Sequence, residues 1–494
     1  MSARLSAGSL VWAGFDGDAI PAPLLDGIAR GRIGGLLLFA LRGNIRSASQ
    51  VRGMLGEAVA AARRADLPPV PVAVDQEGGT VIRIGYRAVF PGAMAIGATG
   101  DPVWAERAAA AVARGLRADG IAVNHAPVCD VNVDPRNPVI GIRAFGDDPE
   151  TVARFAAAWV RGSEGAGVAT TPKHFPGHGA TPYDTHHTTV DVQADRPTLD
   201  ARELAPFRAA IAAGASGMMS AHIRYPALDD DWIATLSPRI LTDLLRGELG
   251  FDGLMVTDSL DMSGVTQVET PDQVVARAIR AGVDAAMVTT GLEAQLAAGE
   301  RIALGVPAPR ILEAIRRVSA FRARFGIAVP EDQDGGDDAA RALSREIAAR
   351  SITAVGPALP DLGGDLRVTV FGPGTRSPVE ELATPVEHLE TGLRERVGTR
   401  LRYARDGALP DGSGPVIVCT SSAVFDPAQA ARTRELLRDG GVLCALRSPY
   451  DATLVPGIAA LLTYGDVPAS LDALADVLAG RASARGSLPV RLPA

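Results

Sequence analysis

Cysteine is scarce in this chain. Only Cys129, Cys419 and Cys444 occur among 494 residues, far apart and each within an apolar run. An odd number of isolated cysteines fits neither a disulfide framework nor a zinc site built from cysteine pairs. We therefore expect three reduced core residues and predict a cytoplasmic protein.

Long apolar runs and an excess of positive charge are also missing. No stretch approaches the roughly 18 apolar residues that a membrane-spanning helix needs. The apolar patch near the N-terminus, of about six residues, is short for the core of a signal peptide. Lysine and arginine number 49 against 57 aspartates and glutamates, for a net charge of -8. This balance argues against a nucleic-acid partner, and we expect a soluble protein with no membrane partner.

What the chain does have is length and a repeating pattern. Its size exceeds one hydrophobic core, so we expect two or three domains. Short apolar runs alternate with alanine- and arginine-rich helical segments over the first 300 residues or so. Eight buried strands, each followed by a helix, predict a (β/α)8 barrel of the TIM type, with a doubly wound open sheet as the alternative. The eight runs are residues 9–15, 35–39, 70–74, 121–124, 169–173, 217–220, 254–257 and 285–288.

A second domain is expected after the barrel. Residues 331–338, EDQDGGDD, are acidic and have no apolar face, which is typical of an exposed linker. We therefore assign residues 1–330 to the catalytic barrel and 339–494 to a smaller three-layer α/β sandwich. In that second part the pattern predicts a helix over 339–353 and strands over 368–371, 416–419, 442–446 and 460–464.

Polar side chains follow several of the predicted strands, at or just beyond their ends. They are Asp75, Asp130, Lys173, His174, His222 and Asp258. In a barrel the active site is assembled from the carboxyl ends of the strands. We therefore expect these side chains to open on one mouth of the barrel.

Residues 173–191, KHFPGHGATPYDTHHTTVD, are rich in histidine. Four of the seven histidines lie there: His174, His178, His186 and His187. A spacing of four would place the first two on one helical face for zinc, but Pro176 and Gly177 break a helix. A metal site built on the loop, with His186 and Asp184 as further ligands, is the alternative to a site without metal.

The same residues offer the groups that cleavage of a glycosidic bond requires. Retention of configuration needs one carboxylate to attack the anomeric carbon and a second group to protonate the leaving oxygen. Asp258, where a buried strand meets a loop, suits the nucleophile. His186 suits the proton donor, because Asp184 two residues earlier can support its imidazolium.

Other strand-end residues suit the binding of a polyol. Asp75, Lys173 and His174 can exchange hydrogen bonds with hydroxyls, and Arg83 and Arg143 add rigid forked donors. Salt bridging at the surface is the alternative role for either arginine.

Together these segments resemble glycoside hydrolase family 3, and within it the two-domain NagZ-type β-N-acetylglucosaminidases. The resemblance is carried by VDQEGG (74–79) with Arg83, IGIRAFG (140–146), KHFPGHG (173–179) with DTH (184–186), SAH (220–222), TDSLDM (257–262) and GSLPV (486–490). It covers the barrel nearly throughout.

The resemblance implies the role of each residue. Asp258 would be the nucleophile and His186, supported by Asp184, the acid/base, with His187 as the neighbouring alternative. The terminal N-acetylglucosamine would be bound by Asp75, Arg83, Arg143, Lys173 and His174, and we add Asp130 and His222 to the candidate substrate-binding residues.

The sequence thus predicts a retaining exo-β-N-acetylglucosaminidase that acts on cell-wall or chitooligosaccharide fragments without metal or organic cofactor. Phosphorolysis on the same scaffold and another family 3 β-glycosidase are the enzymatic alternatives. A metal-dependent hydrolase and a non-catalytic sugar-binding protein are alternatives from other classes.

Overall fold

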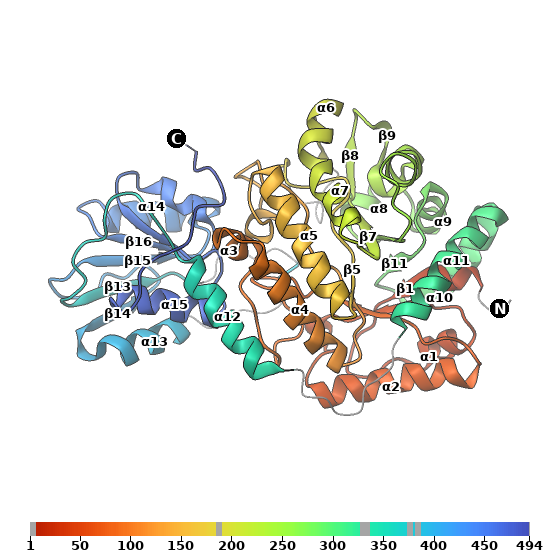
Figure 1. Cartoon of the computed structure of the whole chain (residues 1–494), viewed down its shortest axis with the longest axis horizontal. Helices are drawn as coiled ribbons and strands as arrows, with labels where there is room; N and C mark the ends of the chain where they lie inside the picture. Colours follow the sequence, from red (N-terminus) through yellow and green to blue (C-terminus); the bar gives the residue numbers. More distant parts are fainter. Residues whose placement is uncertain (1–5, 184–189, 327–335, 373–378, 381–386, 494) are drawn as a thin grey trace.

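The first part of the chain, coloured red to green in Figure 1, forms a closed barrel of eight parallel strands. The computed structural model describes residues 6–183, 190–326, 336–372, 379–380 and 387–493. Strands β11, β1, β2, β3, β4 and β5 are neighbours in one sheet, and β10 pairs with β7. Isolated bridges between Phe175 and Ser220 and between Val256 and Ala285 join the two sheets into a ring. The strands are β1 Val11–Ala13, β2 Gly35–Leu37, β3 Val72–Val74, β4 Val123–Asn124, β5 Ala169–Thr170, β7 Gly217–Ser220, β10 Leu254–Thr257 and β11 Ala286–Val288. The predicted (β/α)8 barrel is thereby confirmed.

Helices surround the barrel, and most of them pack on its strands. They are α1 Ala22–Ala29, α2 Ala48–Arg64, α3 Ala93–Ala98, α4 Val103–Ala118, α5 Pro149–Gly165, α6 Arg196–Thr198, α7 Leu204–Ala212, α8 Ser263–Thr266, α9 Pro271–Ala281, α10 Leu292–Gly305 and α11 Ala308–Phe325. These helices pack through apolar faces. Helix α4, for example, buries Ala105, Ala108 and Val112 at helical spacing. Helix α5 can approach α4 closely because Gly162 has no side chain. A Cβ at this position would lie 2.1 Å from the Glu106 carbonyl oxygen.

A small three-stranded sheet lies beside the mouth of the barrel. Strand β8, Ile223–Tyr225, pairs in parallel with β6, Val190–Asp191, and antiparallel with β9, Asp229–Ile233. The Tyr225 hydroxyl donates to the Gly177 carbonyl, which ties this sheet to the histidine-rich loop. Two further helical segments occur in this region of the chain: Leu199–Glu203 lies between β6 and β8, and Arg239–Glu248 lies after β9.

The second part of the chain contains a six-stranded sheet in the order β12-β17-β16-β15-β13-β14. The strands are β12 Thr353–Val355, β13 Leu366–Val370, β14 Leu401–Arg405, β15 Val416–Thr420, β16 Val442–Ala445 and β17 Ala459–Leu462, with helices α12 Asp337–Ser351, α13 Glu387–Val397, α14 Pro427–Leu436 and α15 Pro468–Leu478. The edge strands β12 and β14 were not predicted. Both carry exposed residues, so the continuous apolar run that marked the central strands is missing.

Helices cover both faces of this sheet, and one of them belongs to the barrel part. Ile417 and Cys419 of β15 pack on the side that carries α13 and α15. Val418 packs on the other side, in a cluster that includes Met94 and Ala95 of α3 as well as α14. The barrel therefore supplies part of the third layer of the sandwich.

The region between the two parts begins outside the described residues. Of the predicted linker 331–338, residues 331–335 are not described, and α12 begins at Asp337. Helix α12 contacts the barrel: the Arg87 guanidinium lies 3.0 Å from Asp337, and Ser344 donates a hydrogen bond of 2.7 Å to the Val89 carbonyl. The division at residues 330 and 339 stays a proposal. Over the described part of the chain, no helix is long and apolar enough to cross a membrane.

Candidate active site

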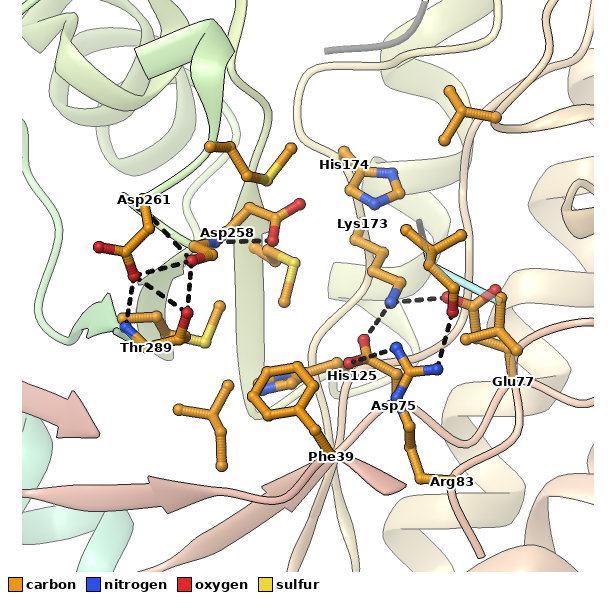
Figure 2. A pocket seen from close by; sticks show the side chains of 18 of the residues that line it. Phe39, Asp75, Glu77, Arg83, His125, Lys173, His174, Asp258, Asp261 and Thr289 are labelled. Carbon is orange, nitrogen blue, oxygen red and sulfur yellow. Dashed lines mark hydrogen bonds and ion pairs between the residues drawn. The ribbon is translucent and has the colours of Figure 1, made fainter. Parts of the chain in front are cut away.

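A cavity of about 450 Å³ lies at the carboxyl ends of the barrel strands (Figure 2). Asp75 follows β3 and Asp258 follows β10, on opposite sides of the cavity in this view. Of the residues predicted to form the site, those that line this cavity are Asp75, Arg83, Arg143, Lys173, His174 and Asp258. The expected meeting of strand ends on one mouth is therefore observed for Asp75, Lys173, His174 and Asp258.

A charged cluster forms one wall. The Lys173 ammonium lies 2.6 Å from Asp75 Oδ1 and 2.7 Å from Glu77 Oε1. Arg143 donates two parallel hydrogen bonds of 2.9 Å to the two carboxylate oxygens of Glu77. The guanidinium of Arg83 lies 3.5 Å from Asp75 Oδ2. Such charge-assisted and bidentate pairs hold the polar ends of these side chains in fixed positions.

These pairs fix the ionisation states at neutral pH. Burial by itself raises the pKa of Asp75, but the charges of Lys173 and Arg83 outweigh it and hold that pKa far below its usual range. Burial likewise raises the pKa of Glu77, and Arg143 together with Lys173 brings it to about 2. Burial lowers the pKa of Lys173, and the two carboxylates more than restore it. The wall therefore presents both hydrogen-bond donors and acceptors that remain charged.

The turn after β3 brings Arg83 to the cavity. Gly78 and Gly79 have φ angles of 91° and 61°, and a Cβ on Gly79 would lie 2.8 Å from the Cα of Gly92. The side-chain oxygen of Gln76 accepts hydrogen bonds of 2.9 Å from the backbone N–H of Arg83 and of Ile84. Glu77 of this motif pairs with Arg143 and Lys173, but the sequence alone did not mark it as a site residue.

Asp130 supports the histidine-rich loop from behind. It is fully buried and does not line the cavity. Its Oδ1 accepts backbone hydrogen bonds from His174 (3.1 Å) and His178 (2.7 Å), and its Oδ2 lies 2.7 Å from Nδ1 of His174. Because a carboxylate only accepts, Nδ1 of His174 carries a proton. Burial lowers the pKa of His178 to about 4, so this second ring is neutral at physiological pH.

Asp258 is held by its own loop. The backbone N–H of Ser259 donates a hydrogen bond of 2.7 Å to Asp258 Oδ1. Asp261 accepts from the backbone N–H groups of Thr289 (2.6 Å) and Thr290 (3.0 Å), which joins the loops after β10 and β11. Asp261 lies within the TDSLDM segment, but no feature of the sequence marked it as a site residue.

His222 lies behind the loop that carries Asp258. It does not line the cavity, and its Nε2 lies 2.9 Å from the carbonyl oxygen of Ser259. Its Nδ1 lies 2.7 Å from the hydroxyl of Thr235. The structure thus places both Asp130 and His222 next to cavity residues instead of in the cavity wall.

The second part of the chain reaches the edge of the cavity at Val379. The backbone carbonyl of Val379 accepts a hydrogen bond of 2.8 Å from Arg83. The next residue, Glu380, lies 3.0 Å from Arg447, which also pairs with Asp466 at 2.9 Å. This contact was not expected from the sequence, because nothing in the local pattern around Val379 marks it as a site residue.

Asp184 and His186 lie outside the described residues, as does His187. The last described residue before them, Tyr183, is 61% exposed. Among the residues that the structure describes, no group of three histidines, cysteines or carboxylates could hold a metal ion.

Comparisons with known proteins agree with the motifs. A family model described as "Glycosyl hydrolase family 3 N terminal domain" matches residues 20–321. Beta-hexosaminidase A of Pseudoalteromonas piscicida is 40% identical over 288 residues, which cover 54% of this chain and 48% of that protein. The chain therefore matches less than half the length of that relative. A beta-hexosaminidase of Stenotrophomonas maltophilia is 41% identical over 261 residues, which cover 51% of this chain and 74% of the relative.

A solved structure resembles the whole chain. The glycoside hydrolase family 3 beta-N-acetylglucosaminidase from Paenibacillus sp. strain FPU-7 superposes with a TM-score of 0.92 at 33% sequence identity. The match covers 100% of this chain and 99% of that one. The similarity thus extends through both parts of the chain.

Proposed function

The chain belongs to glycosyl hydrolase family 3, and from this premise we propose that it removes terminal β-linked N-acetylglucosamine by hydrolysis with retention of configuration. One observation carries the proposal: Asp258 faces, across a single cavity, the charged cluster built on Asp75 and Lys173 (Figure 2). The relatives support the choice of sugar, since two are beta-hexosaminidases and a third is a beta-N-acetylglucosaminidase.

The cavity suits one terminal sugar. Its volume of about 450 Å³ lies at the lower end of the range for small-molecule sites, and its inner end is closed by buried side chains of the barrel, including Met219 and Met287. We assign hydroxyl binding to the charged wall, because Asp75 accepts while Lys173, Arg83 and Arg143 donate. A cavity closed at one end accepts the end of a chain, which fits exo-acting cleavage.

The reaction then proceeds in two steps. In the first, a carboxylate oxygen of Asp258 forms a bond to the anomeric carbon while the bond from that carbon to the leaving oxygen breaks. The proton on the leaving oxygen comes from His186, with Asp184 stabilising the imidazolium that this role requires. In the second step, His186 takes a proton from water, whose oxygen displaces Asp258 and releases the sugar with its original configuration.

The structure supports the placement of the nucleophile in this scheme. Asp258 sits at the end of β10 and its carboxylate is oriented by the N–H of Ser259 at 2.7 Å. A nucleophile mounted on a strand end is held more rigidly than one on a free loop. The proton-donor assignment to His186 rests on the sequence, because that residue lies outside the described part.

Muropeptide fragments of the cell wall and chitooligosaccharides are the proposed substrates, since both end in β-linked N-acetylglucosamine. The test is product analysis on chitobiose and a muropeptide disaccharide, with and without added phosphate. Free N-acetylglucosamine in both conditions, appearing first as the β-anomer in a proton NMR time course, supports the proposal. The α-anomer as first product, or N-acetylglucosamine 1-phosphate formed only with phosphate, would replace it with inversion or phosphorolysis.

A further inference from the structure

The inner end of the cavity is formed mainly by apolar side chains of the barrel strands. Leu37 of β2, Met219 of β7 and Met287 of β11 line it and are each at most 3% exposed. His125, directly after β4, lies among them and is 1% exposed. In Figure 2 its ring is partly covered by that of Phe39 and lies to the left of Asp75. Burial of an imidazole among apolar side chains costs stability unless both nitrogens find hydrogen-bond partners.

The two nitrogens of His125 have different surroundings. Nδ1 lies 2.7 Å from the hydroxyl of Thr171, which anchors the ring. Nε2 is buried and has no hydrogen-bond partner among the described residues. The side chain belongs to the cavity wall that a bound molecule would contact, and its second nitrogen has no protein partner among the described residues.

The charge state of His125 limits what that molecule can be. Burial lowers its pKa to about 4 and outweighs the carboxylates of Asp75 and Asp258, which raise it. The ring is therefore neutral in the physiological range and offers Nε2 as a donor or as an acceptor, according to its tautomer. A sugar hydroxyl can both donate and accept, so it matches this nitrogen in either tautomer.

We propose that Nε2 of His125 forms a hydrogen bond with a hydroxyl of the sugar bound in the cavity and thereby contributes to recognition of that sugar. The proposal deepens the function given above and rests on it. A site built to bond a hydroxyl rejects an analogue that lacks it, because the polar group of the protein is then left unpaired. His125 is in this account a specificity residue at the inner end of the cavity.

The test compares the full-length wild type with His125→Phe, which keeps a flat ring and removes both nitrogens. Each is assayed on an aryl β-N-acetylglucosaminide and on its 3-deoxy, 4-deoxy and 6-deoxy analogues. We expect the variant to lose on the order of 10-fold to 100-fold in kcat/KM on the parent. In the wild type, at least one analogue should have a lower kcat/KM than the parent. In the variant, we expect this difference between analogue and parent to shrink to roughly threefold or less, because the partner of that hydroxyl is already gone.

Two further variants complete the test. Thr171→Val removes the anchor at Nδ1 but keeps Nε2, so it should preserve the wild-type preference for the parent over the same analogue. If His125→Phe does not fold, His125→Leu also lacks polar side-chain atoms and gives the same comparison. Wild-type penalties retained for all three analogues would overturn the assignment of His125 while leaving the proposed function intact. A wild type that does not cleave the parent would overturn both.

Discussion

Nε2 of His222 donates a hydrogen bond of 2.9 Å to the backbone carbonyl of Ser259, the residue that follows Asp258. A carbonyl oxygen only accepts, so this nitrogen carries the proton. His222 is 2% exposed and lies outside the lining of the cavity, although the sequence placed it among the candidate substrate-binding residues. Its position makes it a positioning residue for the loop that carries the proposed nucleophile.

Loss of this bond should reduce kcat more than it changes KM. We expect His222→Phe to lower kcat about 10-fold or more, because a small displacement of a nucleophile weakens the transition state more than binding. His222→Gln can place an amide N–H near the position of Nε2 and should restore most of the activity. Steady-state kinetics on a chitobiose-type substrate would contradict this account if His222→Phe raised KM and left kcat unchanged.

Asp130 should control the tautomer of His174. The carboxylate keeps the proton of His174 on Nδ1, so in the neutral ring Nε2 can accept a hydrogen bond in the cavity. In Asp130→Asn the amide group can donate to Nδ1 and favour the opposite tautomer. We expect kcat/KM to fall on the order of 10-fold to 100-fold, since a required acceptor becomes a donor.

A matched control for this change is Asp134→Asn. Asp134 lies on the same segment but pairs with Arg136, which is 74% exposed at the surface. It should retain kcat/KM within about twofold, because Asp134 does not line the cavity and its partner lies in solvent. Equal kinetics for Asp130→Asn and wild type would show that Asp130 has no influence on the proposed site.

Glu77 should make stability depend on pH in the acid range. Its pKa is about 2 in the folded protein against an ordinary value of 4.5, so its contribution is fully present above about pH 4.5 and is lost as pH falls toward 2. In Glu77→Gln the buried charges of Arg143 and Lys173 lose one of their negative partners. We therefore expect the free energy of unfolding to fall by about 3 kcal/mol at pH 7. The difference in Tm between wild type and variant should narrow between pH 5 and pH 3.

Glu300→Gln serves as the comparison for this measurement, because Glu300 is exposed on α10. It should show almost no change in Tm at any pH in this range. A difference in Tm between Glu77→Gln and wild type that stays constant from pH 7 to pH 3 would be inconsistent with the ion pairs described for Glu77.

His186, if it is the acid/base, should matter in proportion to how poor the leaving group is. His186→Ala should lose far more activity on a natural disaccharide than on an aryl glycoside with an acidic phenol, which departs without protonation. Azide, which needs no deprotonation, should accelerate turnover of the trapped intermediate. His187→Ala is the matched control, and leaving-group dependence in that variant alone would move the assignment by one residue.

The architecture of the barrel was accessible from the sequence because its strands are buried on both faces. Each of the eight apolar runs coincides with a strand, and the motifs that they carry identify the family correctly. The residues at strand ends could be placed on one mouth for the same reason. Asp75 and Lys173 show this best, since they lie 98 residues apart and approach to 2.6 Å.

The sequence did not show how deeply each side chain enters the cavity or which distant residue it contacts. His222 and Asp130 follow strands as Asp258 does, but whether such a side chain enters the cavity or lies behind it depends on packing. His125 was missed because one histidine within an apolar run shows no periodicity. The contact between Arg83 and Val379 joins residues 296 apart, and no local pattern encodes it. The packing of α3 against the second sheet is equally a matter of tertiary structure.

The central claim is that Asp258 attacks the sugar, and trapping the intermediate tests it most directly. A slow fluorinated donor, such as a 5-fluoro N-acetylglucosaminyl fluoride, should add one glycosyl unit to the intact protein. Mass spectrometry of the digested adduct should then place the added mass on Asp258, and Asp258→Asn should remain unlabelled. Label on another residue, or turnover through an oxazoline without any protein adduct, would contradict the account.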